Sequence, residues 1–145
     1  MIAAAPMSGA MKAGVAILIA AFVGFGVLML RTFDPNVAGS PFPPCMFHAL
    51  TGLYCPGCGL TRALHALVHF DLGRALAMNA LFVVSAPILL LLSLRSNGWL
   101  PRWTEAGLLP LTRPLFWLVL VVSFGVLRNL PWAPFSWLAP GGWPG

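Results

Sequence analysis

All three cysteines of this 145-residue chain lie in one short stretch, at positions 45, 55 and 58. A disulfide-stapled secreted domain has an even number of cysteines spread along its length. A local cluster of three indicates instead a metal site, a redox pair or a tight structural loop. We therefore expect the chemistry of the chain in the segment that carries these thiols.

The first interpretation is a metal site made of two chelating pairs. Two residues separate Cys45 from His48, two separate Cys55 from Cys58, and six lie between the pairs. Three thiolates and one imidazole are the ligand set of a closed structural zinc site. Iron is the alternative metal for this set. His65 is the alternative fourth ligand.

The second interpretation is a thiol–disulfide exchange pair in Cys55-Pro56-Gly57-Cys58. A proline suits the first position of a helix, so Cys55 is expected beside a helix N-terminus, where the dipole stabilises a thiolate. Arg62, one turn beyond Cys58, adds positive potential. Cys55 would then attack a disulfide, Cys58 would resolve it, and Cys45 would act as a relay. No strand–helix–strand pattern surrounds the pair, so a thioredoxin-like fold is not expected.

The third interpretation gives the cysteines no chemistry of their own. Free cysteine is commonly buried, so Cys55 and Cys58 would be small packed residues or a structural disulfide. Thr61 would then be a cap residue, and the function would lie in binding a partner. The sequence leaves all three interpretations open.

The composition places the cluster in a membrane protein. Apolar residues make up 59% of the chain and charged residues 8%, and the mean hydropathy is +0.90. A soluble domain has roughly 45–50% apolar and about 25% charged residues, which excludes an ordinary soluble domain and a disordered chain. The net charge of +5 comes from scattered bases. Membrane anchoring explains such bases better than a nucleic-acid site does.

Three charge-poor stretches predict three transmembrane helices, at about 13–31, 75–94 and 113–129. The first two approach or reach the length needed for a hydrocarbon core of roughly 30 Å, and the third is shorter. A signal peptide is the alternative for the first stretch, but its apolar region would be only about 7–15 residues long. Pro87 predicts a kink within the second helix.

Residues 32–73 are predicted to form a Cys loop followed by a short helix. Prolines and glycines break any long helix before Leu60, and a helix is then predicted from Leu60 to Phe70 with Gly73 as its C-terminal cap. This helix is too short to span, so we expect an interfacial or re-entrant helix. The Trp- and Pro-rich tail, residues 130–145, suits the headgroup layer. The chain is thus predicted to be one all-α integral membrane domain, residues 1–145.

Three spans would bring residues that are distant in sequence to one membrane face. Asn79, Arg128 and Asn129 would lie on the side of the Cys loop and support the site together with Thr61 and Arg62. The basic residues fall on two sides, with Lys12, Arg95, Arg102 and Arg113 on one and Arg31, Arg62, Arg74 and Arg128 on the other. If Arg62 is engaged within the Cys motif and is left out of the count, four basic residues stand against three. The positive-inside rule then favours a cytoplasmic N-terminus and an extracytoplasmic Cys loop.

The stretch from Cys45 through Leu50-Thr51-Gly52 to Cys55-Pro-Gly-Cys-Gly-Leu-Thr-Arg62 resembles the signature of a bacterial membrane family, domain of unknown function 2752. That signature is a cysteine, then Leu-Thr-Gly, then Cys-Pro-x-Cys-Gly-x-Thr-Arg. The resemblance is expected to extend over about residues 40–130, although Met46 stands where the family usually has proline. It implies a small protein with a few membrane helices in a bacterial inner membrane, and it carries no established activity.

These features together predict a small multi-pass membrane protein that is not an enzyme. Its Cys loop, packed or metal-stapled, would contact a membrane-protein partner or a second copy of the chain within the lipid bilayer. The alternative is a membrane thiol–disulfide oxidoreductase that uses Cys55 and Cys58. A Gly-rich phosphate loop, a Ser-His-Asp set and an acid pair within a span are all absent from the sequence.

Overall fold

The structure is a computed structural model that describes residues 8–37, 39–97 and 110–142, and these residues form helices and no strand. The long helices are α1 (Gly9–Thr32), α4 (Leu72–Ser96) and α6 (Pro114–Leu127). Two short helices, α2 (Met46–Thr51) and α3 (Leu60–Val68), lie between α1 and α4, and the 3-10 turns η2 (Pro110–Thr112) and η3 (Phe135–Leu138) flank α6. Over these residues, the prediction of an all-α fold is confirmed. Arg102 and the last three residues of the predicted tail, 143–145, lie outside the described residues.

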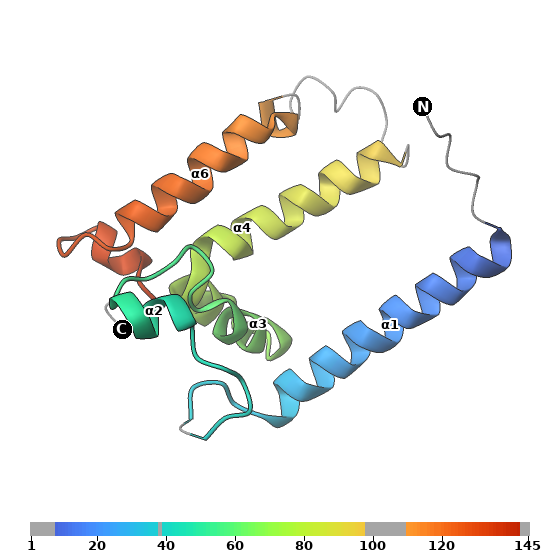
Figure 1. The fold of residues 1–145 in the computed structure, drawn as a ribbon, viewed down its shortest axis with the longest axis horizontal. Helices are drawn as coiled ribbons and strands as arrows, with labels where there is room; N and C mark the ends of the chain where they lie inside the picture. The colour runs from blue at the N-terminus through green and yellow to red at the C-terminus, as the bar shows by residue number, and fades with distance from the viewer. Residues whose placement is uncertain (1–7, 38, 98–109, 143–145) are drawn as a thin grey trace.

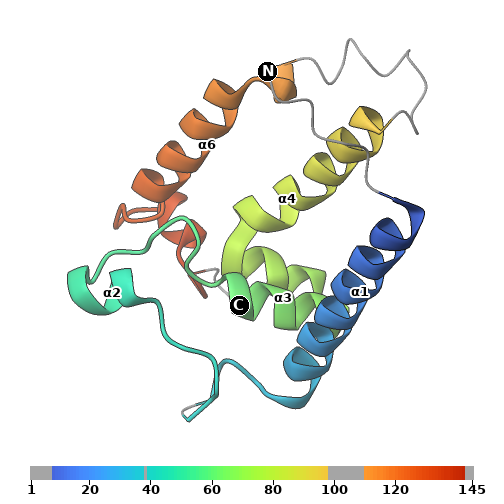
Figure 2. The ribbon, with the colours of Figure 1, turned by 45° about the vertical axis from the view of Figure 1, so that its right-hand side comes forward.

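The long helices are roughly aligned, and the short elements gather at one end of the molecule. Figure 1 shows α2, α3, the start of α4 and the end of α6 at this end, and Figure 2 shows the same grouping from another side. The C-terminal end of α1 reaches the same region and packs against α3. The Cys loop is therefore held where several helix ends meet.

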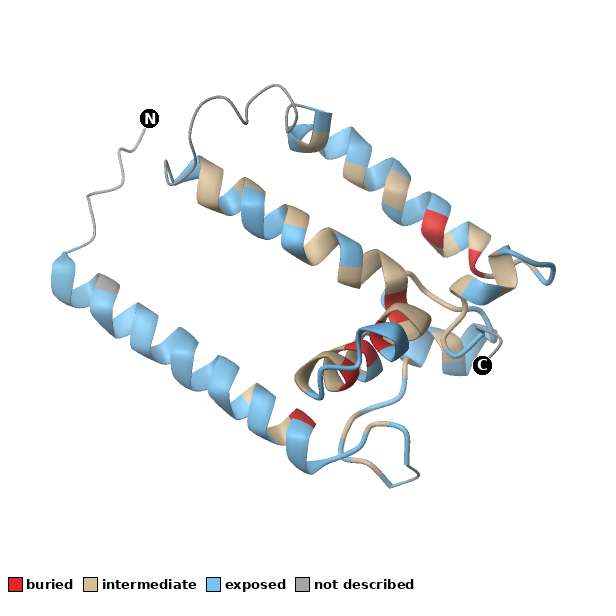
Figure 3. Cartoon of the chain, turned by 180° about the vertical axis from the view of Figure 1, so that it is seen from behind, coloured by how far each residue is buried: buried red, intermediate tan, exposed pale blue. Residues whose placement is uncertain are grey.

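Helix α1 is apolar on every face and almost wholly exposed. Ser8 caps it by accepting a hydrogen bond from the backbone N–H of Met11 at 3.3 Å, and the side chain of Phe22 is 79% exposed. Figure 3 shows α1 as nearly all exposed, whereas buried residues collect around α3. A helix that is apolar all round and lacks protein cover suits lipid as its surroundings. By length and composition, α1 and α4 are both candidate membrane spans.

Helix α6 is apolar but shorter than the other two. It has 14 residues, which at about 1.5 Å per residue covers less than a hydrocarbon core of roughly 30 Å. Two helices, not three, therefore meet the length needed for a span within the described residues. The third predicted span stays a prediction.

The break in α4 is at Asn79, eight residues before the proline that was predicted to kink it. Asn79 has φ −156° and ψ 87°, which separates the helix into two parts. Its side-chain oxygen accepts a hydrogen bond from the N–H of Phe82 at 3.0 Å, so Asn79 acts as the N-cap of the second part. The break also frees the carbonyl of Ala77, which accepts a hydrogen bond from the N–H of Gly141 in the tail at 3.2 Å.

The junction between α3 and α4 also differs from the prediction. Helix α3 ends at Val68, and Phe70 adopts a left-handed conformation with φ 61°. The N–H of Asp71 bonds the carbonyl of Ala66 at 2.9 Å, and that of Phe70 bonds Leu67 at 3.0 Å, which is the Schellman pattern. Gly73 is therefore not a C-cap but lies inside α4, whose N-cap is Asp71. The Asp71 side chain accepts a hydrogen bond from the N–H of Arg74 at 2.8 Å. This cap starts α4 at Leu72, so Gly73 falls in the first turn of a new helix and does not end the previous one.

The protein core is small and lies between α3 and α4. Ala63 and Ala75 are 0% exposed, and Ala66 is 2% exposed. Small side chains let two helices approach closely, which is a common packing mode between membrane helices. This close packing fixes the start of α3, and with it the turn that carries Cys55 and Cys58.

Candidate metal centre

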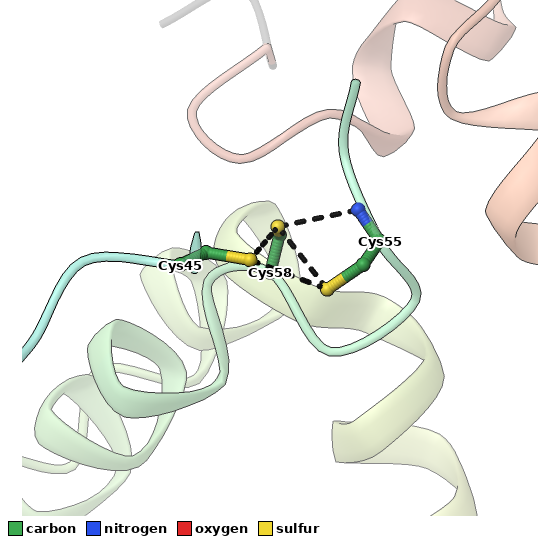
Figure 4. A group of neighbouring side chains, drawn as sticks. All are labelled: Cys45, Cys55 and Cys58. Atoms are coloured by element: carbon green, nitrogen blue, oxygen red, sulfur yellow. Dashed lines mark hydrogen bonds between the residues drawn. The ribbon is translucent and has the colours of Figure 1, made fainter. Parts of the chain in front are cut away.

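The structure brings all three cysteines together into one triangle of sulfur atoms. The Sγ atoms of Cys45 and Cys58 are 3.1 Å apart, those of Cys55 and Cys58 are 3.3 Å apart, and those of Cys45 and Cys55 are 3.5 Å apart. Figure 4 shows the three side chains converging, with Cys45 arriving from the chain segment before α2. Three sulfurs at nearly equal spacing differ from a pair poised for a disulfide with a distant third cysteine.

This triangle is close to the size that a tetrahedral metal ion requires. Metal–sulfur bonds of about 2.3 Å place two sulfurs about 3.8 Å apart. Each edge of the triangle would lengthen by less than about 1 Å on binding, which rotation of the cysteine side chains can supply. The ligand atoms of the three cysteines all lie within 4.8 Å of one another, and in the described residues no histidine or carboxylate joins them.

Cys55 and Pro56 lie in a turn before α3 rather than at its first positions. Helix α3 begins at Leu60 with Gly59 as its N-cap, so the predicted proline at the first helical position is wrong. Gly59 has φ 83°, and a Cβ there would overlap the carbonyl oxygen of Met78 in α4. Only glycine combines that backbone conformation with that approach. The turn therefore starts α3 directly against α4.

Arg128 holds the backbone of this turn from the end of α6. Its side chain is 1% exposed. One terminal nitrogen donates to the carbonyls of Cys55 at 2.9 Å and Pro56 at 3.2 Å, and the other donates to that of Cys58 at 3.2 Å. The guanidinium also lies over the rings of Phe124, at 4.7 Å, and Tyr54, at 5.8 Å. It is a buried cation without a carboxylate partner in the described chain, and its Nε has no hydrogen-bond partner there.

Asn79 binds the same turn from α4. Its side-chain amide donates to the carbonyls of Pro56 at 2.9 Å and Cys58 at 3.2 Å, and the residue is 2% exposed. The break in α4 is thus tied to the cysteine turn, because one side chain caps the helix and also binds the turn. Figure 3 marks buried residues at the start of α4 and at the end of α6.

Asn129 fixes the residue that precedes the turn. Its side-chain oxygen accepts from the N–H of Tyr54 at 2.8 Å, and its amide donates to the carbonyl of Tyr54 at 2.9 Å and that of Gly125 at 2.7 Å. A Cβ at Gly125 would be only 2.9 Å from the ring of Pro56. The end of α6 therefore lies directly against the turn. Of the predicted supporting residues, Asn79 and Arg128 bind the turn and Asn129 binds the residue before it.

Neither histidine proposed as a fourth ligand reaches the sulfur cluster. The His48 ring stacks on Tyr54 with centroids 4.4 Å apart, and its Nδ1 lies 3.3 Å from the carbonyl oxygen of Leu53. His65 Nδ1 lies 2.6 Å from the carbonyl oxygen of Leu30, so this residue joins α3 to the end of α1. The structure thus brings together the three thiols of the predicted ligand set and leaves out both imidazoles.

A cavity of about 720 Å³ opens beside the sulfur triangle. All three cysteines line it, together with His48 and the two other predicted site residues, Thr61 and Arg62. None of the described residues that line it is acidic. The sulfurs are therefore reachable from the cavity, while the carbonyls of their turn are bound by α4 and α6.

The thiols differ in acidity. Hydrogen bonds from the Cys58 thiol and from the backbone N–H of His48 lower the pKa of Cys45 to about 7. Burial, and then the hydrogen bonds with Cys45 and Cys55, raise the pKa of Cys58 to about 12. Of these two thiols, Cys45 is therefore the one expected as a thiolate near neutral pH.

Two aromatic residues at the site were not singled out from the sequence. Tyr54 and Phe124 both contact the guanidinium of Arg128, from the Cys loop and from α6. The spacing of Phe124 and Arg128, four residues apart on one helix, is a signal that could have identified one of them. Tyr54 gives no comparable signal, because its position depends on the fold of the loop.

Comparison with known proteins finds a family model that is similar to the cysteine segment and that assigns it no activity. No curated protein and no solved structure matches the chain significantly. A family model matches one segment of the chain, which runs from Cys45 into α4 and ends before α6. The predicted extension of the resemblance to Arg128-Asn129 is therefore not part of this match. Residues 45–93 match the model of the family described as protein of unknown function (DUF2752), which confirms the predicted family resemblance.

Proposed function

We propose that this protein is a small multi-pass membrane protein whose Cys45, Cys55 and Cys58 bind one metal ion, zinc or iron, as three thiolates. The single observation that carries the proposal is the triangle of three sulfurs within 3.5 Å of one another. The bound ion staples the Cys loop to the helix ends, and the stapled loop docks a membrane-protein partner or a second copy of the chain. The role is structural rather than enzymatic.

The charges around the cluster support this proposal. Three thiolates and a divalent ion carry a net charge of −1. The buried guanidinium of Arg128 is bonded to the carbonyls of two of the three cysteines and supplies a charge of +1. A buried cation is costly unless an anion offsets it. A metal–thiolate centre provides that anion where the described chain offers no carboxylate.

We further propose that α6 is a third crossing and that the Cys loop faces the outside of a bacterial inner membrane. Helix α6 is apolar and 14 residues long. The η2 turn before it and Arg128-Asn129 after it would lie at the two interfaces. The positive-inside rule supports a cytoplasmic N-terminus.

The test is the metal content of the purified protein with each cysteine replaced in turn. The account predicts about one zinc or iron ion per chain. Cys45→Ser, Cys55→Ser and Cys58→Ser should each reduce metal affinity at least tenfold, because each removes one of three ligands. Leu53→Ser is the matched control, since it introduces the same residue on an exposed side chain of the same loop. A chain without metal, or retention of metal by all three cysteine variants, would contradict the proposal.

A second candidate function, thiol–disulfide exchange, is favoured by the lowered pKa of Cys45. The Cys45 thiolate would attack a substrate disulfide and release one substrate thiolate. Cys58, 3.1 Å away, would then give its proton to solvent, attack the mixed disulfide and release the second thiolate. Cys45 and Cys58 would end oxidised and the substrate reduced. The metal assay separates the two functions, because an exchange catalyst holds no metal and forms a disulfide that mild reductant opens.

A further inference from the structure

The sulfur triangle leaves one coordination position without a ligand from the described chain. A tetrahedral ion on three thiolates needs a fourth donor. No other histidine, cysteine or carboxylate of the described residues belongs to the cluster. His48 is the nearest alternative in sequence, but its ring stacks on Tyr54 and its Nδ1 faces Leu53. The fourth donor must therefore come from outside this part of the chain.

The cavity beside the triangle gives such a donor a path. Its volume of about 720 Å³ falls within the range of small-molecule sites, roughly 300–1,000 Å³. The three cysteines form part of its wall. On the far side of the turn, Arg128 and Asn79 occupy the carbonyl groups. A ligand therefore reaches the metal from the cavity.

Two properties of the site decide which kind of fourth ligand binds the metal ion: the charge of the cavity wall and the preference of the ion for soft ligands. Three thiolates favour a soft or borderline ion, which prefers sulfur or nitrogen to oxygen in its remaining position. Arg128 already offsets the charge of the three-thiolate centre. Arg62 lines the cavity and makes no hydrogen bond or ion pair with the described chain, so it is free to offset one more negative charge. That charge favours a thiolate over a neutral imidazole.

We infer that the cavity binds an exogenous thiol, whose sulfur completes four-thiolate coordination of the metal on Cys45, Cys55 and Cys58 with Arg62 offsetting its charge. This inference rests on the proposed metal function. On binding, the thiol loses its proton to water and its sulfur replaces a metal-bound water. The thiol comes from a small molecule or from a cysteine of another protein, and the cavity volume favours the small molecule.

The test uses Co²⁺ as a probe, because thiolate-to-cobalt charge-transfer absorption grows with the number of bound thiolates. The full chain in detergent is loaded with Co²⁺ without oxygen and titrated with 2-mercaptoethanol. The expected result is a saturable increase of about one third in this absorption, from three thiolates to four. A short peptide with one cysteine is titrated in parallel, and tighter binding of the peptide would assign the thiol to a protein.

Three variants make the result specific. Arg62→Gln should weaken binding of 2-mercaptoethanol about fivefold, whereas Arg62→Lys keeps the charge and should bind nearly as the unmodified chain does. His48→Gln should leave the initial thiolate-to-cobalt absorption unchanged, because the His48 ring stacks on Tyr54 and does not reach the sulfurs. Imidazole is titrated as a comparison ligand. If Co²⁺ binds and its spectrum responds to imidazole but not to 2-mercaptoethanol, the inference is overturned and the metal site stands. The same conclusion follows if His48→Gln reduces the initial absorption. If the chain shows no thiolate-to-cobalt absorption at all, the metal site itself is overturned.

Discussion

Cys45, Cys55 and Cys58 owe their meeting to two different parts of the chain. Cys55 and Cys58 lie in one turn, where the N–H of Cys55 also bonds the sulfur of Cys58 at 3.2 Å. Cys45 precedes α2, ten residues earlier than Cys55, and reaches them because α2 reverses the direction of the loop. Gly52, the left-handed C-cap of α2 with φ 71°, completes that reversal.

At the residue scale, we predict that Cys45 is more reactive than Cys58 in the metal-free protein at neutral pH. Its pKa of about 7 leaves about half of it as thiolate at pH 7, whereas the pKa of about 12 keeps Cys58 protonated. The rate of Cys45 alkylation by iodoacetamide should therefore fall as the pH drops from 8 to 6, with a midpoint near pH 7. Mass spectrometry of peptides after timed alkylation measures this rate. Faster alkylation of Cys58 than of Cys45 at pH 7 would contradict the assignment.

At the element scale, the site depends on how closely α3 starts against α4 and how closely α6 ends against the turn. Arg128 and Asn79 each bind the turn's carbonyls, and Asn79 also caps the second half of α4. Helix ends normally leave backbone groups unpaired. Here those ends carry the polar side chains that satisfy the turn, so the helices and the cysteine loop stabilise one another.

We predict that Gly59→Ala destabilises the protein more than Gly52→Ala does. Both glycines have positive φ, so each substitution pays about 1–2 kcal/mol for the left-handed conformation. A Cβ at Gly59 also overlaps the carbonyl of Met78, whereas a Cβ at Gly52 meets open space. Gly59→Ala should therefore cost at least about 1 kcal/mol more and weaken metal binding. Thermal unfolding in detergent and metal titration of the two variants measure this. Equal losses would show that the contact with α4 does not matter.

The elements near the cysteines were predicted well because their signals are local. Apolar stretches gave α1 and most of α4, and the start of α3 at Leu60 was predicted to the residue. The break at Asn79 was missed because it depends on contacts with Pro56 and Cys58, which the sequence does not reveal. Pro87 was the stronger local signal, but the backbone change within α4 is at Asn79.

The sequence indicated which residues come together at the Cys loop, but only part of their geometry. Topology alone indicated that Asn79, Arg128 and Asn129 face the Cys loop, and all three bind it. The fourth ligand could not be predicted, because spacing says that His48 is near Cys45 in sequence and says nothing about where its ring points. Its stacking on Tyr54 follows from the turn at Leu53, which only the folded loop defines.

At the scale of the whole molecule, most of the described chain is apolar surface around a small polar centre. The buried polar residues Asn79 and Arg128 both lie at the cysteine end, while α1 carries almost no buried residue. An exposed apolar helix needs lipid or a partner to cover it. Together with the two candidate spans, α1 and α4, this arrangement suits a membrane protein.

We predict that the two ends of the chain lie on opposite sides of the membrane. Three crossings by α1, α4 and α6 give this result, whereas two crossings place both ends on the same side. Reporter domains that are active on only one side of the membrane, fused in turn to each end, distinguish the two arrangements. A membrane-impermeant thiol reagent applied to intact cells should also modify metal-free Cys45 if the Cys loop faces outward. Active reporters on one common side would refute the third crossing.

The most direct test of the central claim is X-ray absorption at the zinc edge of the zinc-loaded chain, purified without added thiol. The account predicts three sulfur neighbours at about 2.3 Å, with one lighter donor completing the shell. Loss of one sulfur neighbour should follow Cys45→Ser, since Cys45 arrives from a separate segment of the loop. A shell of nitrogen and oxygen ligands at about 2.0–2.1 Å, with fewer than three sulfurs, would contradict the claim that the three cysteines form one metal centre.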